Sequence, residues 1–215
     1  TWIGDDQDGE TYLAACRAAG VTLDGVSVAP GAPSTRCLLI YNADGTYGCL
    51  LRSGPCRLTD AQRRIAAGAA WLVVAAGPPE ELGALLDLVG PATRLAWIAK
   101  DDPACFPPNL AARLADRADV VFCNAGERGW LETARAAPRP VGQMLFETRG
   151  AEGVRVEAGG AVSDLPVAPL IVDDATGAGD TFAGAALAVL VGGGSPRAAA
   201  DAGIAAARAL LAARR

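Results

Sequence analysis

Short apolar runs alternate with amphipathic segments along most of this chain, and this pattern predicts strands and helices in turn. Apolar strands that alternate with helices are typical of a parallel sheet covered by helices on both faces. We therefore predict an α/β fold with three α/β/α layers around a mostly parallel, Rossmann-like central sheet. The predicted strands are 71–75, 95–99, 120–123, 141–148 and 170–172. One helix is predicted between each pair of successive strands among the first four: 79–89, 108–117 and 125–136.

The first third of the chain has a different pattern. A helix is predicted over residues 8–19, ended by Gly20, and another begins at the capping box Thr59-Asp60-Ala61-Gln62 and runs to about Gly68. Between them, residues 26–54 are rich in β-branched and turn residues. Asn42-Ala43-Asp44-Gly45 predicts a hairpin turn between strands 36–41 and 46–52, which by pattern alone fits an ordinary edge hairpin.

Two elements are predicted near the end of the chain. Residues 154–157 and 161–167 read as an antiparallel hairpin that precedes the strand 170–172. Ser195-Pro196 is a typical helix start, because serine caps the first turn and proline suits its first position. We expect the last helix to run from there to about Ala213.

The turn Thr176-Gly177-Ala178-Gly179, followed by Asp180, is the most informative segment for function. A small-residue turn at a helix start presents unpaired N–H groups, backed by the positive end of the helix dipole, and such a start suits a phosphate. A carboxylate beside a bound anion is electrostatically unfavourable, so its presence there indicates a function. That function could be to accept a proton from a hydroxyl that attacks the phosphate. The alternative is a tight strand-to-helix connection in which Asp180 only complements the dipole.

Two common phosphate-binding motifs are excluded. The chain has no Gly-x-x-x-x-Gly-Lys-Ser/Thr run, so it has no P-loop. A dinucleotide fingerprint needs a small residue where Phe182 stands and further βαβ units after it, whereas the remaining residues read as helix.

Three polar or glycine-bearing segments follow predicted strands. Asn124 comes after 120–123, Thr148 ends 141–148, and Gly177 comes after 170–172. In open α/β sheets ligands bind beyond the carboxyl ends of the strands, so we expect these three positions to share one rim. Asn124 and Glu127 also fit a helix capping box, and both roles are compatible.

Composition narrows the classes of function. The chain has 215 residues, of which 51% are hydrophobic, so we expect one core and one domain over 1–215. Its net charge of −5 and dispersed basic residues argue against nucleic acid as a partner. It has no histidine, which excludes Ser-His and Cys-His catalysis, and its six cysteines form no Cys-x-x-Cys pair. Cysteines in apolar surroundings and the lack of a membrane-length apolar run predict a cytoplasmic protein without a membrane partner.

The string from Asp174 to Ala185, Asp-x-Thr-Gly-Ala-Gly-Asp-Thr-Phe-x-Gly-Ala, resembles the C-terminal signature of the ribokinase-like (PfkB) carbohydrate kinases. Three other segments resemble motifs of that family in the same order: 4–9 with Gly20-Val21, 124–127, and 148–153. The resemblance covers essentially the whole chain. It implies a ribokinase-like domain that lacks the family's N-terminal portion, with residues 26–54 contributing to a small β lid through which a homodimer could form.

The resemblance also assigns roles to single residues. It implies that Asp180 is the catalytic base and that the amides of Gly177, Ala178 and Gly179 form an anion hole with that of Asp180. It implies that Asn124 and Glu127 organise Mg²⁺ through water, and that Asp174 helps to bind a monovalent cation such as K⁺. The expected nucleotide contacts, in addition to Asn124 and Glu127, are Thr148, Gly150, Gly153 and Thr176. Thr35 and Arg36 are candidate acceptor contacts, with a structural role in the lid as the alternative.

These observations predict an ATP- and Mg²⁺-dependent kinase that transfers the γ-phosphoryl group to a hydroxyl of a sugar or sugar-like acceptor. A nucleoside kinase of the same family and a non-catalytic nucleotide- or metabolite-binding protein are the alternatives. The chain departs from the family at Lys100-Asp101-Asp102-Pro103, and it lacks a common asparagine in Gly203-Ile204-Ala205-Ala206. We therefore expect mainly apolar packing around the adenine.

Overall fold

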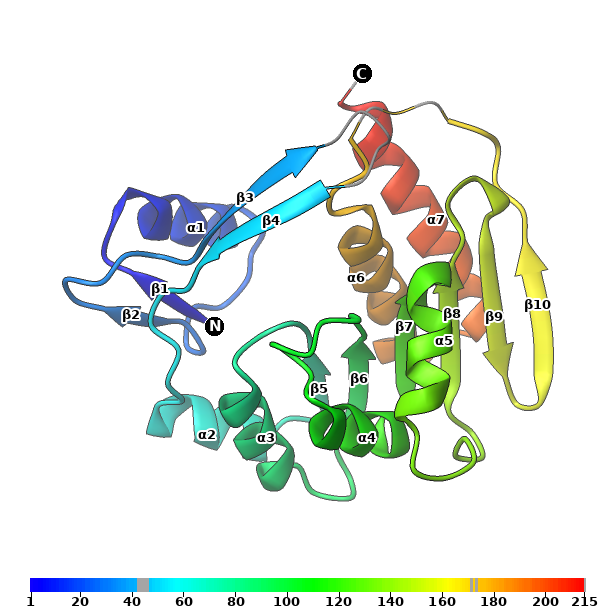
Figure 1. The fold of residues 1–215 in the computed structure, drawn as a ribbon, viewed down its shortest axis with the longest axis horizontal. Coiled ribbons are helices and arrows are strands. Elements are labelled where there is room, and N and C mark those ends of the chain that lie inside the picture. The colour runs from blue at the N-terminus through cyan, green and yellow to red at the C-terminus, as the bar shows by residue number, and fades with distance from the viewer. Residues whose placement is uncertain (42–46, 171, 173, 215) are drawn as a thin grey trace. The chain divides into compact units, whose positions relative to one another are not determined.

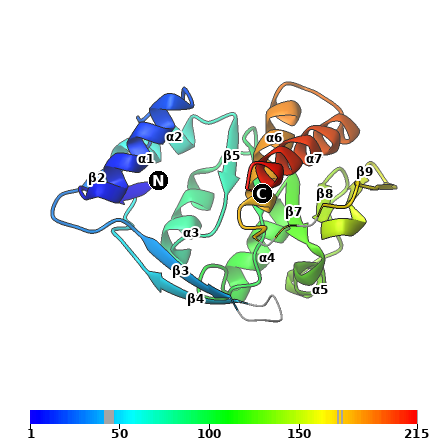
Figure 2. The same ribbon diagram turned by 90° about the horizontal axis from the view of Figure 1, so that it is seen from above.

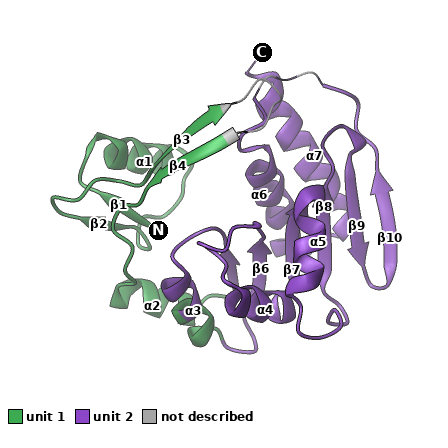
Figure 3. Ribbon diagram, in the orientation of Figure 1, with its two compact units in different colours: residues 1–69, 84–89 green, residues 70–83, 90–215 purple. Residues whose placement is uncertain are grey.

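The computed structural model describes residues 1–41, 47–170, 172 and 174–214. They form two compact units, of which unit 1 comprises residues 1–69 and 84–89 and unit 2 comprises residues 70–83 and 90–215 (Figure 3). The predicted hairpin turn at 42–45 lies outside the described residues. That the whole chain is one domain stays a prediction.

Unit 1 contains two small sheets and two complete helices. β1 (Trp2–Gly4) pairs in parallel with β2 (Ser27–Ala29), and β3 (Arg36–Tyr41) pairs antiparallel with β4 (Tyr47–Arg52). The helices are α1 (Gln7–Ala18) and α2 (Asp60–Ala67), and both were predicted. The capping box at α2 is confirmed, because the Gln62 amide donates to Thr59 Oγ1 and the Thr59 amide donates to Gln62 Oε1. α3 (Pro79–Leu88) begins in unit 2 and ends in unit 1.

Unit 2 is built on a six-stranded sheet of order β10-β9-β8-β7-β6-β5. The four strands from β5 to β8 run parallel, and β9 and β10 are antiparallel additions at one edge. This confirms the predicted α/β class. The strands are β5 (Trp71–Val74), β6 (Arg94–Ile98), β7 (Val120–Asn124), β8 (Met144–Thr148), β9 (Val154–Ala158) and β10 (Ala161–Leu165), and the helices are α4 (Pro108–Arg117), α5 (Ala125–Ala134), α6 (Ala178–Val191) and α7 (Pro196–Ala212), with a 3₁₀ turn at Gly150–Glu152.

Helices cover both faces of this sheet. α6 and α7 lie on one side of β7 and β8, and α4 and α5 lie on the other (Figures 1 and 2). On the α5 side, the buried Trp97 ring packs edge-on against Phe106 and Trp130, at 5.5 and 5.8 Å between ring centroids. Because successive residues of a strand point to opposite faces and helices cover both, most positions of the central strands are apolar.

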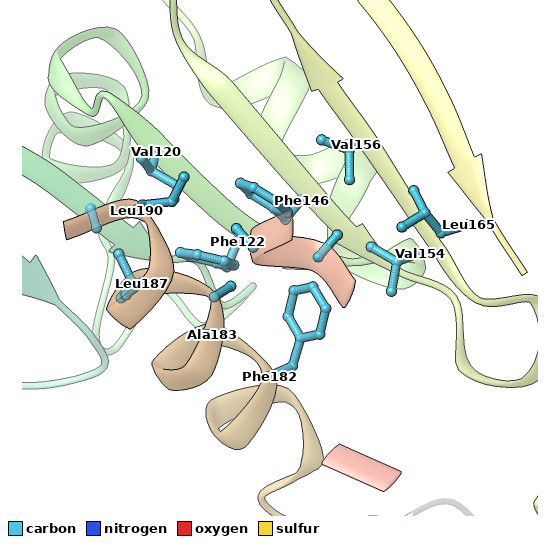
Figure 4. Close-up of a cluster of buried hydrophobic side chains, with 14 residues drawn as sticks. Val120, Phe122, Phe146, Val154, Val156, Leu165, Phe182, Ala183, Leu187 and Leu190 are labelled. Atoms are coloured by element: carbon cyan, nitrogen blue, oxygen red, sulfur yellow. The ribbon is translucent and has the colours of Figure 1, made fainter. Parts of the chain in front are cut away.

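The core between the sheet and α6 is centred on three phenylalanines. Phe122 of β7 stacks on Phe146 of β8, and Phe182 of α6 packs against both (Figure 4). α7 approaches α6 closely at Gly203, where a Cβ atom would lie 2.5 Å from the Phe182 ring. Contacts between these helices therefore depend on glycine and alanine.

The prediction of a strand at 170–172 is wrong for the residues that the structure describes. Leu170 and Val172 lie outside any strand, and Ile171 lies outside the described part of the chain. Two features account for this. Pro166 and Pro169 cannot donate to a strand ladder, and just before this segment the Ala168 carbonyl accepts a hydrogen bond from Arg208 of α7. The predicted strand 141–148 is shorter than expected, because Gly142 has a φ of +90° and β8 begins at Met144.

Candidate active site

α6 begins without a side-chain cap. Its N-cap residue is Gly177, whose φ of +78° and ψ of −2° lie in the left-handed region that favours glycine. Among the described residues no side chain caps this helix start, although Ser, Thr, Asp and Asn are strongly preferred there. Asp180 lies in the first turn and is exposed. The carboxylate is therefore accessible to a ligand rather than packed into the core.

The amides of this turn are only partly used by the protein itself. The Ala178 amide donates to the Ala175 carbonyl at 3.1 Å, so it is already engaged. Among the described residues, the amides of Gly177, Gly179 and Asp180 have no hydrogen-bond acceptor. Of the four amides predicted for an anion hole, those of Gly177, Gly179 and Asp180 are thus open, whereas that of Ala178 is not.

The loop before α6 is held by an arginine from the end of the chain. The Thr176 amide donates to Asp174 Oδ1 at 2.8 Å. Arg214 Nη1 donates to the Thr176 carbonyl at 2.5 Å and lies 3.5 Å from Asp174 Oδ2. A guanidinium therefore lies beside the residue predicted to help bind a monovalent cation.

The carboxyl ends of β7 and β8 lie side by side, as predicted. Asn124 and Thr148 are direct partners in the register of these strands. Phe182 packs on Phe122 and Phe146, each two residues before one of these strand ends. Leu190, farther along α6, lies toward Val120 at the opposite end of β7 (Figure 4). The beginning of α6 is therefore held at the edge of the sheet where β7 and β8 end.

Asn124 and Glu127 form a reciprocal capping box at the start of α5. The Glu127 amide donates to Asn124 Oδ1 at 2.9 Å, and the Asn124 amide donates to Glu127 Oε2 at 2.8 Å. Burial raises the pKa of Glu127, while the Asn124 amide and the charge of Lys100 act in the opposite direction. Lys100 follows β6, so three neighbouring strands bring polar groups to this edge.

Backbone hydrogen bonds within the turn after β8 largely account for its conformation. The Arg149 amide donates to the Gly153 carbonyl, and the Gly153 amide donates to the Gly150 carbonyl. Gly153 is buried with a φ of +98°, and a Cβ atom there would lie 2.0 Å from the Leu165 carbonyl oxygen. A side chain at position 153 would therefore clash with the backbone, so glycine is required there. Gly150 is exposed, and a side chain there would meet no such contact.

The two candidate acceptor contacts, Thr35 and Arg36, belong to unit 1. Thr35 Oγ1 accepts a hydrogen bond from the Gly54 amide at 2.9 Å, and Arg36 pairs with Asp8. Asp6 caps α1 and accepts hydrogen bonds from the Ser34 hydroxyl and amide, which lower the pKa of Asp6 to about 2. These side chains hold the ends of unit 1 segments together, and an acceptor-binding role for Thr35 and Arg36 stays a prediction.

Sequence patterns missed two arginines near the end of the chain, Arg208 of α7 and Arg214 just after that helix. Arg208 and Arg214 both donate to the segment before α6, forty and thirty-eight residues away in the chain. In the sequence, Arg208 interrupts the alanine-rich run of the last helix, and Arg214 follows that helix. Nothing in that pattern indicates which backbone carbonyls they reach.

Comparison with known proteins gives the family and the fold of this chain. The profile described as "pfkB family carbohydrate kinase" matches residues 1–214. The chain belongs to the pfkB family. The pfkB chain is 29% identical over 240 residues to the 2-dehydro-3-deoxygluconokinase of Thermoproteus tenax, a match that covers 95% of this chain and 70% of that protein.

Solved structures of the same fold are also similar to this chain. A ribokinase from Cryptococcus neoformans var. grubii in complex with ADP has a TM-score of 0.80 at 24% identity, over 96% of this chain and 74% of that one. The adenosine kinase of Sinorhizobium meliloti has a TM-score of 0.80 at 21% identity, over 98% and 71%. These likenesses confirm the ribokinase-like fold.

Membership of this family makes the chain an ATP-dependent kinase of the carbohydrate type, a phosphotransferase that acts on a hydroxyl group. Within the described residues, no helix is both long and apolar enough to span a membrane. Nor do the described residues contain a group of three histidine, cysteine or acidic side chains that could hold a metal ion by themselves.

Proposed function

We propose that the pfkB chain binds the terminal phosphates of a nucleotide at the start of α6 and transfers the γ-phosphoryl group to a hydroxyl activated by Asp180. One observation carries this proposal. The helix begins at a left-handed glycine with no side-chain cap, and the amides of Gly177, Gly179 and Asp180 have no acceptor within the described chain, beside an exposed carboxylate. An uncapped helix start is a favourable place for an anion.

Asp180 and the amides have separate tasks in this reaction. The Asp180 carboxylate accepts the proton of the acceptor hydroxyl as that oxygen attacks the γ-phosphorus, a role of general bases in phosphoryl transfer. The amides donate to the phosphoryl oxygens, whose charge they stabilise in the transition state. Preorganised donors of this kind contribute roughly 3–4 kcal/mol each.

The residues present fit a magnesium ion bound through water. Mg²⁺ is usually held by one or two carboxylates together with substrate phosphates and several waters, so it does not need a cluster of three acidic side chains. Glu127 uses Oε2 to accept from the Asn124 amide in the capping box, which leaves Oε1 for a water of the ion. We propose that Glu127 and Asn124 hold the ion through water, where it would neutralise phosphate charge.

A monovalent cation at Asp174 is a weaker fit. The guanidinium of Arg214 already brings positive charge to Asp174 Oδ2 and the Thr176 carbonyl. An ion such as K⁺ would have to share these oxygens with Arg214 or displace that side chain. The proposed reaction therefore does not depend on a monovalent cation. The remaining proposed nucleotide contacts are at the turn after β8 and the loop before α6: Thr148, Gly150, Gly153 and Thr176.

For the acceptor we propose a sugar or sugar-like molecule, with a nucleoside as the second candidate. The relative with the higher identity is a sugar-acid kinase by name, whereas structures of the same fold include an adenosine kinase. Thr35 and Arg36 of unit 1 are the proposed acceptor contacts. We further propose a cytoplasmic enzyme that dimerises through the β3–β4 hairpin, whose side chains Leu38 and Leu50 are 60% and 62% exposed.

The test is a coupled assay of ADP release with ATP and Mg²⁺ across a panel of sugars, sugar acids and nucleosides. We expect acceptor-dependent ADP release that is lost in Asp180→Asn. Isothermal titration with ATP and Mg²⁺ runs in parallel. Binding of ATP without ADP release for any acceptor would contradict the assignment of Asp180 and favour a protein that only binds nucleotide.

A further inference from the structure

Two cysteines of unit 1 lie against each other on the β3–β4 hairpin. Cys37 pairs with Leu51 and Leu39 pairs with Cys49, so both cysteines point to the same face on neighbouring strands. Their Sγ atoms are 2.7 Å apart. A disulfide bond is about 2.05 Å long, so a shift of less than about 1 Å brings the sulfurs to bonding distance.

These two thiols are also the accessible ones. Of the six cysteines, Cys37 and Cys49 are exposed, whereas Cys123 is buried and Cys16, Cys56 and Cys105 are half-buried. Burial raises the pKa of Cys123 to about 12 and also raises the pKa of Cys105, which disfavours the reactive thiolate at both positions. A thiol reagent therefore meets the hairpin pair first.

We propose that Cys37 and Cys49 form a modification site that takes low-molecular-weight disulfides such as oxidised glutathione, and that the product is an intramolecular Cys37–Cys49 disulfide. This inference does not depend on the proposed kinase mechanism. It concerns only the hairpin and reagents of the disulfide class.

The reaction proceeds by two exchanges. One cysteine thiolate attacks a sulfur of oxidised glutathione, which forms a protein–glutathione mixed disulfide and releases one reduced glutathione. The second cysteine, after losing its proton, attacks the protein sulfur of that mixed disulfide and releases a second glutathione thiolate, which takes up a proton. The two cysteines lose two electrons and two protons, and one oxidised glutathione gains them.

The second exchange is favoured because it is intramolecular. Even a short flexible tether holds two groups at an effective concentration of about millimolar, and here the strands already orient the thiols. Within the described residues, β3 and β4 pair only with each other, and the hairpin leucines Leu38, Leu50 and Leu51 are exposed, so little packing specifies its register. A covalent link between β3 and β4 would fix that register and stabilise the hairpin.

The experiment treats the reduced protein with oxidised glutathione at mildly alkaline pH, blocks the remaining thiols and measures intact mass and peptides. We expect a monomer lighter by two hydrogens, whose crosslinked peptide pair contains Cys37 and Cys49, with the other four cysteines blocked as thiols. Reduction should restore the original mass. Accumulation of glutathione adducts at both positions, or disulfide-linked dimers instead of the internal link, would overturn the proposal.

A matched variant controls for simple exposure. The double substitution Cys49→Ser/Leu50→Cys moves the thiol by one residue, to the opposite face of β4, where position 50 pairs with Leu38. It keeps two exposed thiols on the hairpin, and exposed substitutions usually change stability by no more than about 0.5 kcal/mol. We expect glutathione adducts and at least about tenfold slower internal crosslinking in this variant. Equal rates in the two proteins would show that the pairing of Cys37 with Cys49 has no special role.

Discussion

α5 and α6 both begin at the same edge of the unit 2 sheet, yet their first turns are built in opposite ways. At α5 the side chains of Asn124 and Glu127 satisfy each other's backbone amides. At α6 the start is a left-handed glycine without a side-chain cap. A side-chain cap stabilises a helix by only a few tenths of a kcal/mol relative to a glycine at the same position, so the open start of α6 forgoes little stability. The difference indicates which of the two helix starts is built for a ligand.

The largest expected effect comes from exchanging a carboxylate for an amide at each helix start. Asp180→Asn removes the proposed base, and kcat should fall by about 10²–10⁴, the range for a lost general base. Glu127→Gln retains the capping box and should lower kcat only about tenfold through weaker organisation of Mg²⁺. Steady-state kinetics with the best acceptor measures both. Equal losses in the two variants would remove the distinction between the helices.

Adding one methyl group at each glycine of the open turn sharpens the same comparison. Gly177→Ala forces alanine to a φ of +78° and should lower the free energy of unfolding by about 1–2 kcal/mol. At Gly179 no described heavy atom beyond its chain neighbours and the adjacent helix backbone lies within 4 Å of the position that a Cβ would take, so Gly179→Ala should stabilise α6 by up to about 1 kcal/mol. Urea unfolding measures both. If Gly179→Ala keeps full activity, close approach of phosphate to that residue is contradicted.

Arg214 offers a test of how the open turn is held. Arg214→Gln removes the charge that contacts Asp174 and weakens the hydrogen bond to the Thr176 carbonyl. We expect kcat to fall about tenfold, the effect of about 1.4 kcal/mol in the transition state, with partial recovery in Arg214→Lys. Addition of KCl to Arg214→Gln shows whether an ion takes the vacated charge. Unchanged kinetics in Arg214→Gln would mean that the loop before α6 keeps its conformation without the Arg214 guanidinium.

The smallest effect concerns pH and the closed start of α5. Burial raises the pKa of Glu127, so the fold favours its protonated form. The folded protein is therefore stabilised by protonation of Glu127. This contribution to the unfolding free energy is fully present below the pKa of about 4.3 that Glu has in the unfolded chain, and it is lost as pH rises through the higher pKa of the folded state. Glu127→Gln lacks this loss. Its unfolding free energy should therefore rise relative to the unsubstituted protein between about pH 4 and pH 7, by less than about 1 kcal/mol because solvent screens the half-exposed group. A constant difference across this range would contradict the assigned shift.

Much of the fold and of the candidate site could be predicted because the signals are local. The capping boxes at Thr59 and Asn124 depend on residues three positions apart, and both are present in the structure. The alternation of apolar strands with helices predicted the parallel part of the sheet. The Gly177-Ala178-Gly179-Asp180 segment also carries its own information, because glycine and a helix start act over a few residues.

Contacts between distant segments could not be predicted in the same way. Whether Leu170 and Val172 join a strand depends on a free neighbouring edge, and the flanking residues are bound from elsewhere: Arg208 of α7 donates to the Ala168 carbonyl, and Arg214 donates to the Thr176 carbonyl. Which amides of the α6 turn stay open depends on the Ala175 carbonyl, which accepts from Ala178.

The sequence by itself therefore determined the order of helices and strands, the capping residues and the family, since each is encoded over a few neighbouring residues or in a linear motif. Only the tertiary structure decided three other features: the strand register that makes Asn124 and Thr148 direct partners, the packing of Phe182 that holds the α6 start at that edge, and the contact between Cys37 and Cys49. Each of these joins residues that are far apart in the chain, and the packing of the folded protein alone brings them together.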